Sequence, residues 1–147
     1  MLFLMEISAD SYRIAIDGAG YGIFDLNVEN GSLRCSGGLL TSLGYPPYKI
    51  IENIEDFESL ISPIDIPRFR EALQQQIRDY TPLNVDLRML LKKGGSRWLS
   101  MKGGFQVSNT GSVCRLTAII VDIDRYKSAE LRIHKIAELL SSPDESQ

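Results

Sequence analysis

The sequence is poor in the side chains that build catalytic and metal sites. Its 147 residues include one histidine, His134, and two cysteines, Cys35 and Cys114. This set excludes an ordinary Cys/His metal cluster and a disulfide framework. A serine–histidine pair would depend on His134 alone, and no serine lies in the Gly-x-Ser-x-Gly turn of hydrolases. We therefore expect two reduced thiols, an exposed helix histidine and no metal.

Excess positive charge and long apolar runs are also absent. The 16 Lys and Arg residues are outnumbered by 19 Asp and Glu, giving a net charge of −3, which argues against a nucleic-acid partner. The opening "MLFLMEI" is too short to span a membrane and lacks the layout of a signal peptide. We expect a cytoplasmic protein whose first residues pack as part of an N-terminal helix or against a partner.

Residues 21–35 predict two neighbouring antiparallel strands. Asp25 and Asn27 alternate with apolar residues, as in a half-buried strand. These apolar residues are Phe24, Leu26 and Val28. Asn30-Gly31 then accepts the positive φ angles of a tight hairpin turn.

Helical patterns precede and follow this hairpin. A short helix should end near Gly18, and residues 37–61, broken by Gly, Pro and Asn, predict small helices or turns. The clearest helix covers 66–80, with Asp65 placed to cap it and Arg, Glu and Gln on its polar side. Its apolar side consists of Phe69, Leu73, Ile77 and Tyr80.

Three further alternating runs follow Pro82, at 83–91, 96–107 and 112–123. Gly94-Gly95 separates the first two and leads into a strand, whereas a phosphate-binding loop leads into a helix. We therefore interpret it as a hairpin turn. Two strands, then helices, then three strands favour an α+β fold with a five-stranded antiparallel sheet.

The last helical segment carries an apolar seam of about two heptads. Its members are Tyr126, Ala129, Ile133, Ile136 and Leu140. Two alternatives remain open: the helix lies back on its own sheet, or it pairs with a second copy or passes movement to a downstream domain. The tail after Pro143 should be frayed.

Five segments, in order, resemble the PAS/PAC sensory domain of bacterial sensor kinases and of GGDEF/EAL cyclic-di-GMP proteins. They are "YRIAIDGAGYGIFDLNVENG", "SLGY", "ISPIDIPRFREAL", "VDLRMLLKKGGSRWL" and "LTAIIVDIDRYKSAELRI". Arg97-Trp98 and Asp122 match the motifs of this subgroup. The departures are Phe24 and Leu26 at its two first-strand tryptophans, Gly95 at its hairpin Asp, Asp124 at the Thr of its "DIT", and Ala118 at a Gly.

The resemblance implies a PAS fold with helices on one face of the sheet and a C-terminal exit helix. It divides the chain into an N-terminal helical cap (1–20), a PAS domain (21–124) and a signalling helix with tail (125–147). It implies an interior ligand pocket, lined by Phe24, Leu26, Phe69, Leu73, Leu87, Met89, Leu99 and Leu116. It also implies a signal relay made of Arg97, Trp98, Asp122, Ile123 and Asp124.

The cofactor is left unknown. The haem-binding members need an axial ligand on the long helix, and residues 66–80 contain no histidine. The covalent flavin sensors use a cysteine within "NCRFLQ", which is absent here.

Asp122 and Asp124 point the same way on a strand. We expect Asp122 to pair with a base such as Arg97, and Asp124 to cap the exit helix.

Three functions follow as hypotheses. The first is a module that senses a small ligand or relays a signal to an effector domain. The second is a ligand-free PAS domain that serves only as a homodimer scaffold. The third is a small α+β enzyme using Asp25 and Asp86, which should both face away from the core.

Overall fold

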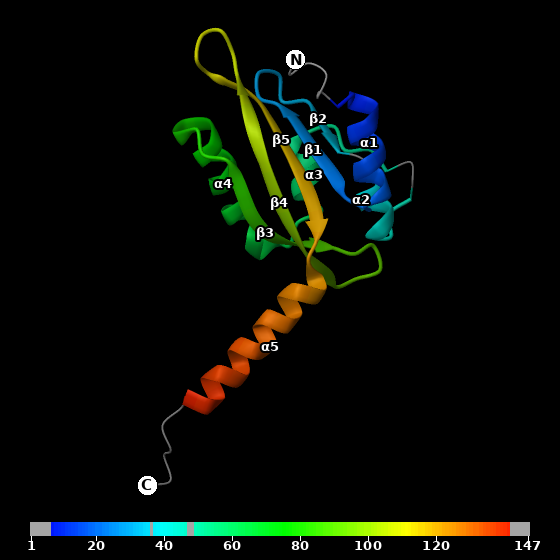
Figure 1. Cartoon of the computed structure of the whole chain (residues 1–147), viewed down its shortest axis with the longest axis vertical. Coiled ribbons are helices and arrows are strands. Elements are labelled where there is room, and N and C mark those ends of the chain that lie inside the picture. The colour runs from blue at the N-terminus through cyan, green and yellow to red at the C-terminus, as the bar shows by residue number, and fades with distance from the viewer. Residues whose placement is uncertain (1–6, 36, 47–48, 142–147) are drawn as a thin grey trace.

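The computed structural model describes residues 7–35, 37–46 and 49–141. Its five strands form one antiparallel sheet in the order β2–β1–β5–β4–β3 (Figure 1), which confirms the predicted fold class. The strands are β1 (Gly22–Asn27), β2 (Leu33–Cys35), β3 (Leu83–Leu90), β4 (Ser96–Val107) and β5 (Val113–Asp122). The last strand therefore lies at the centre of the sheet, between β1 and β4.

One face of the sheet is covered by helices. The helical elements are α1 (Ala9–Gly18), α2 (Gly37–Ser42), α3 (Ile54–Glu58), the 3-10 turn η2 (Pro63–Asp65), α4 (Ile66–Asp79) and α5 (Asp124–Ser141). Phe24 of β1 meets Phe57 of α3 and Phe69 of α4, with ring centroids 5.0 and 6.1 Å away. These edge-to-face contacts place the core between the sheet and the two helices.

The β1–β2 hairpin forms as predicted, but its turn is different. Gly31 has a φ of 76°, whereas Asn30 keeps a negative φ. The side-chain oxygen of Asn27 accepts from the N–H groups of Glu29 and Asn30, at 2.9 and 3.2 Å. This Asx turn replaces the second positive φ that the Asn-Gly pair predicted.

Helix α4 buries a side chain that its sequence pattern placed in solvent. Phe69 and Leu73 pack into the core as predicted, but Gln76 is also only 1% exposed. Gln76 lies three residues after Leu73 and seven after Phe69, so it shares their helical face. The polar character of the residue concealed a core position.

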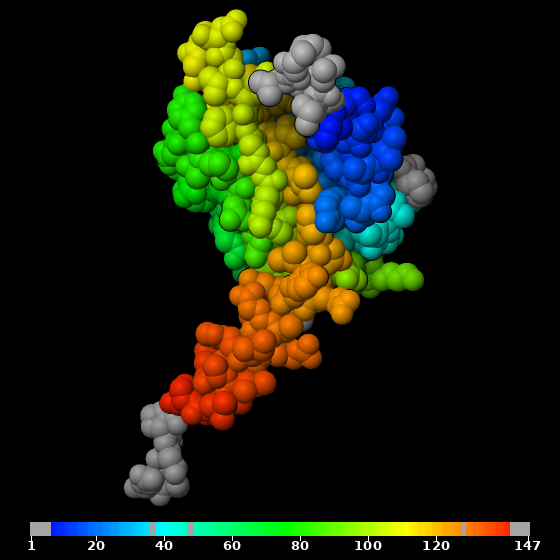
Figure 2. All heavy atoms as spheres, viewed as in Figure 1, coloured from blue at the N-terminus to red at the C-terminus, as the bar shows by residue number. Residues whose placement is uncertain are grey.

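The two ends of the described chain carry little of the core. Helix α1 ends at Gly18 as predicted, but none of its side chains is buried. Helix α5 extends beyond the body of the domain (Figure 2). The alternative in which it lies back on its own sheet is therefore wrong. The predictions for residues 1–6 and for the tail at 142–147 lie outside the described residues.

Candidate functional site at the start of the C-terminal helix

The chain passes from β5 into α5 beside Trp98 of β4. The Ile123 N–H donates to the Trp98 carbonyl oxygen at 3.0 Å. The Trp98 N–H donates to a carboxylate oxygen of Asp124, also at 3.0 Å. Both backbone groups of Trp98 therefore hold the first residues of α5. The Ile123 bond continues the β4–β5 pairing one residue past the end of β5, and the Asp124 carboxylate adds a second bond, so the start of α5 is tied to the sheet.

Asp122 is the second point of attachment. One of its oxygens accepts from the Asp124 N–H at 2.9 Å, and the other lies 2.9 Å from Nε of Arg97 as an ion pair. The structure thus brings all five predicted relay residues together. The predicted capping role of Asp124 is wrong: Asp124 is the first residue of α5, and its carboxylate turns to Trp98. The Arg97–Asp122 pair is exposed, so it orients α5 more than it stabilises the fold.

The indole ring of Trp98 is contacted by two cations that sequence reasoning missed. Cζ of Arg88, the cross-strand partner of Trp98 on β3, lies 4.9 Å from the ring centroid. Nζ of Lys127, in α5, lies 5.2 Å from it. Lys127 also lies 3.5 Å from the Asp86 carboxylate. The ring quadrupole attracts both cations, so α5 meets the sheet through a side chain as well as through the backbone.

Asp65, just before α4, anchors the Arg88 side chain. Its carboxylate is only 1% exposed and accepts from the backbone N–H, Nε and Nη2 of Arg88 at 2.8, 3.0 and 2.8 Å. These hydrogen bonds hold the pKa of Asp65 below its ordinary value. The predicted side-chain cap is wrong because the carboxylate turns to the edge of β3 and makes no capping bond to α4.

The residues predicted to line an interior pocket all lie in one buried core. They are Phe24, Leu26, Phe69, Leu73, Leu87, Met89, Leu99 and Leu116. Phe57, which the prediction omitted, is also buried there, with its ring 5.4 Å from that of Phe69. Three aromatic rings thus pack between the sheet and the helices, and the ligand-binding role of this core stays a prediction.

Gln76 places one amide inside this apolar core. Its Nε2 donates to the Gly104 carbonyl oxygen at 3.4 Å, while its Oε1 is buried without a hydrogen-bond partner. An unsatisfied buried acceptor costs about 1–3 kcal/mol. The amide oxygen is therefore a point at which the donor group of a ligand would be stabilised.

A family model for the PAS fold matches residues 32–120. The chain belongs to the PAS fold family. This PAS domain is 25% identical over 121 residues to the sensor protein FixL of Bradyrhizobium diazoefficiens. The matched region covers 82% of this chain but only 24% of FixL. The chain thus spans about a quarter of the length of that curated relative.

Solved structures share the fold of this PAS domain. A sensory box histidine kinase/response regulator from Burkholderia thailandensis superposes with a TM-score of 0.75 at 24% identity, covering 88% of this chain and 96% of that one. The N-terminal domain of a diguanylate cyclase with PAS/PAC sensor, from Marinobacter aquaeolei, gives 0.65 at 18% identity, over 73% and 98% of the two chains.

The predicted seam of α5 is exposed in the PAS domain. Tyr126, Ile133, Ile136 and Leu140 are between 55% and 83% exposed, and Ala129 is partly buried. Burying one such aliphatic side chain is worth about 1.5–3 kcal/mol. The seam side chains do not gain this free energy within the described chain because they lie in solvent. The seam is therefore accessible to a partner.

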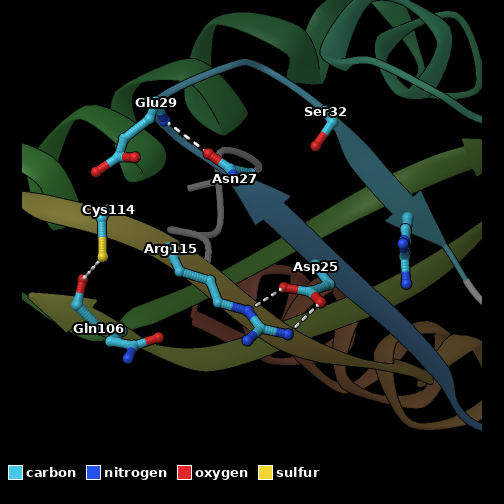
Figure 3. Close-up of a pocket in the computed structure, with 8 residues that line it drawn as sticks. Asp25, Asn27, Glu29, Ser32, Gln106, Cys114 and Arg115 are labelled. Carbon is cyan, nitrogen blue, oxygen red and sulfur yellow. Dashed lines mark hydrogen bonds and ion pairs between the residues drawn. The ribbon is translucent and has the colours of Figure 1, made fainter. Parts of the chain in front are cut away.

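The face of the sheet that points away from the core carries a polar hollow of about 390 Å³ (Figure 3). Asp25 lies in it and pairs with Arg115 through two hydrogen bonds of 2.8 and 2.6 Å. The Arg115 bonds lower the pKa of Asp25, so the carboxyl stays ionised and is a poor proton donor. Asp25 faces away from the core as predicted, and Asp86 is held by Lys127.

The remaining reactive side chains are placed as follows. Burial raises the pKa of the Cys35 thiol to about 11, which suppresses its thiolate. His134 is exposed on α5 and lies 3.2 Å from Glu138. In residues 7–35, 37–46 and 49–141, no cluster of three His, Cys, Asp or Glu side chains could hold a metal ion. No helix of that part is long and apolar enough to cross a membrane.

Proposed function

We propose that this PAS domain senses or relays a signal and passes it through α5 to an effector domain of a longer protein. The observation that carries the proposal is the pair of hydrogen bonds that join the backbone of Trp98 to Ile123 and to the Asp124 carboxylate. A change in the sheet that moves β4 against β5 moves the first turn of α5 with it. Such a change alters output only if it favours one of two arrangements of α5.

The similar proteins support this role. FixL is a sensor protein, and the two similar structures come from a histidine kinase and a diguanylate cyclase. We propose a cytoplasmic effector of one of these two classes. The proposed division keeps residues 1–20 as a cap, 21–124 as the sensor and 125–147 as the signalling helix with its tail. In this division the PAS domain itself performs no reaction.

We propose that the exposed seam of α5 pairs with a second copy of the chain. Two heptads make a marginal coiled coil by themselves, so dimerisation would depend on continuation of the helix into the effector. A homodimer would let a small rotation at Trp98 change the pairing of two effector domains.

Two versions of this function differ in the interior. In the first, a small ligand enters the core and donates a hydrogen bond to Oε1 of Gln76. In the second, the rings of Phe24, Phe57 and Phe69 fill the core, and the domain is a ligand-free dimerisation scaffold. Native mass spectrometry of the purified protein distinguishes them, because a retained small molecule excludes the pure scaffold. The weaker enzyme alternative would need a poised acid, and Asp25 is held ionised by Arg115.

The relay is tested in the full-length protein with Asp122→Ala. We expect this change to free the Asp124 N–H and Arg97, and to alter both the direction of α5 and effector output. Asp25→Ala is the matched control, since it removes a partly buried, arginine-paired carboxylate on β1 that takes no part in the junction with α5. If Asp122→Ala leaves helix direction and output as they were, the proposed relay is wrong.

A further inference from the structure

A chain of contacts runs from the start of α4 to the first turns of α5 without passing through Asp122. It begins at the buried carboxylate of Asp65, which holds the Arg88 side chain by two of its nitrogens. Arg88 lies against the ring of Trp98. Lys127 of α5 lies against the same ring and pairs with Asp86.

Each member of this chain is constrained. Asp65 is buried, and its pKa is lowered by Arg88, so the carboxylate stays charged at neutral pH. Trp98 has both backbone groups bonded to residues 123 and 124. The Lys127 side chain is only 21% exposed, which is low for lysine. Lys127 therefore keeps its ammonium group against the domain although the rest of α5 extends into solvent.

Contact with the rest of the domain is concentrated at this end of α5. Two side chains of α5 reach the sheet here: the Asp124 carboxylate accepts from the Trp98 N–H, and Lys127 lies against the Trp98 ring and pairs with Asp86. A lysine that leaves Trp98 would free the first turn of α5 to pivot on the hydrogen bonds at residues 123 and 124.

We propose that Asp65, Arg88, Trp98, Lys127 and Asp86 form a latch that couples the start of α4 to the direction of α5. Lys127 is its positioning residue on α5, and Arg88 connects it to α4. The latch rests on the proposed relay function and adds a second route to it. Helix α4 covers the core, so a ligand or partner that displaces its start would loosen Arg88 and then Lys127.

Amide hydrogen exchange of residues 127–131, followed by NMR in the whole chain, tests the latch. Lys127→Met removes the cation, and Trp98→Leu removes the ring but keeps its backbone bonds. We expect each change to speed exchange roughly two- to fivefold, the factor that one partly exposed cation–π contact contributes. In the double variant, the increase in exchange rate should be clearly smaller than the product of the two single increases. Both changes remove the same contact, that of Lys127 with the Trp98 ring.

Lys135→Met is the matched control. It removes an exposed lysine two turns further along α5, and exchange at residues 127–131 should not change. Factors that multiply fully in the Lys127→Met and Trp98→Leu pair would overturn the latch.

Arg88→Lys tests the connection to α4. It keeps the charge but loses the planar group that both holds Asp65 and lies on Trp98. We expect faster exchange at residues 127–131 because Arg88 supports the Trp98 ring, and unchanged exchange there overturns the coupling to α4. Exchange of β4 and β5 amides serves as the check on folding. If those amides also exchange faster, Arg88→Lys has loosened the fold itself. The latch is then judged on the exchange rates of the Lys127→Met and Trp98→Leu variants and their combination.

Effector output of the full-length protein separates the latch from the relay. Altered output in Asp122→Ala together with fully multiplying exchange factors would overturn the latch and leave the relay in place. Coupled exchange factors without any change of output, in these variants and in Asp122→Ala, would support the latch as a structural device and overturn the relay.

Discussion

The body of the domain and helix α5 use apolar side chains in opposite ways. In the body, Phe24, Phe57 and Phe69 are fully buried against one another. In α5, Ile133 and Leu140 are 68% and 83% exposed. The body therefore buries its own apolar side chains, whereas α5 leaves apolar side chains in solvent. A helix that owes little of its stability to the domain can change direction without unfolding it.

Core truncation gives the sharpest contrast between the two regions. Phe24→Ala removes one of three packed rings, and we expect it to lower the free energy of unfolding by about 3–5 kcal/mol. Ile133→Ala should change it by less than about 0.5 kcal/mol in the monomer, because that side chain is already in solvent. Urea denaturation measures both. An equal loss in the two variants would show that α5 is part of the folded body.

Buried and exposed ion pairs give a second contrast. Asp65→Asn removes the buried charge that pairs with the partly exposed Arg88, and we expect a loss of about 2–4 kcal/mol. Asp25→Asn is the matched control, since Arg115 is exposed; its loss should stay within about 1 kcal/mol. Thermal and urea unfolding at neutral pH compare them. A smaller loss of unfolding free energy in Asp65→Asn than in Asp25→Asn would show that the Asp65–Arg88 pair does not stabilise the fold as proposed.

The pH dependence of stability sharpens the same comparison. The pKa values of Asp65 and Asp25 are both lowered in the folded state by their arginine partners. The stability that they contribute is therefore fully present above the ordinary pKa of aspartate, about 3.9. It is lost as pH falls through the lower folded values. Unfolding free energies measured from pH 6 down to pH 2 should decline less steeply in Asp65→Asn than in the unchanged chain, and parallel curves would contradict this.

A small effect on stability is also expected at the junction itself. Asp122→Ala removes an exposed ion pair with Arg97, so unfolding should change by no more than about 1 kcal/mol. The same variant is expected to alter the direction of α5. A large loss of stability would show that Asp122 belongs to the body, and the separation of the two regions would fail there.

The periodicity of apolar residues in the sequence predicted the strands that bury one face against the core. The alternation at Phe24 and Leu26, and at Val85, Leu87 and Met89, located β1 and β3 because inward residues there are apolar. Gln76 was placed on the wrong side because a polar residue can occupy a core-facing helical position. Its spacing from Phe69 and Leu73 indicates the buried face, but its polar type hid that position.

The sequence predicted the part of the candidate site that consists of the β5–α5 junction and the two residues that the family resemblance adds to it. Asp122 and Asp124 are separated by one residue in the sequence, and the family resemblance placed Arg97 and Trp98 with them. The rest of the site depends on tertiary structure: Asp65, Arg88 and Lys127 are far apart in sequence and meet only when η2, β3 and α5 are in place. The type and position of Asp65 fit a helix cap, but its carboxylate instead accepts three hydrogen bonds from Arg88.

The central claim is that α5 takes its direction from the sheet through residues 122–124 and Trp98. Residual dipolar couplings of backbone amides in α5 and in β4 measure it directly, since they report how far the two elements are aligned as one body. The account predicts equal alignment of α5 and β4 in the unchanged chain and a reduced alignment of α5 in Asp122→Ala. Equal alignment in both proteins, or independent alignment already in the unchanged chain, would contradict it.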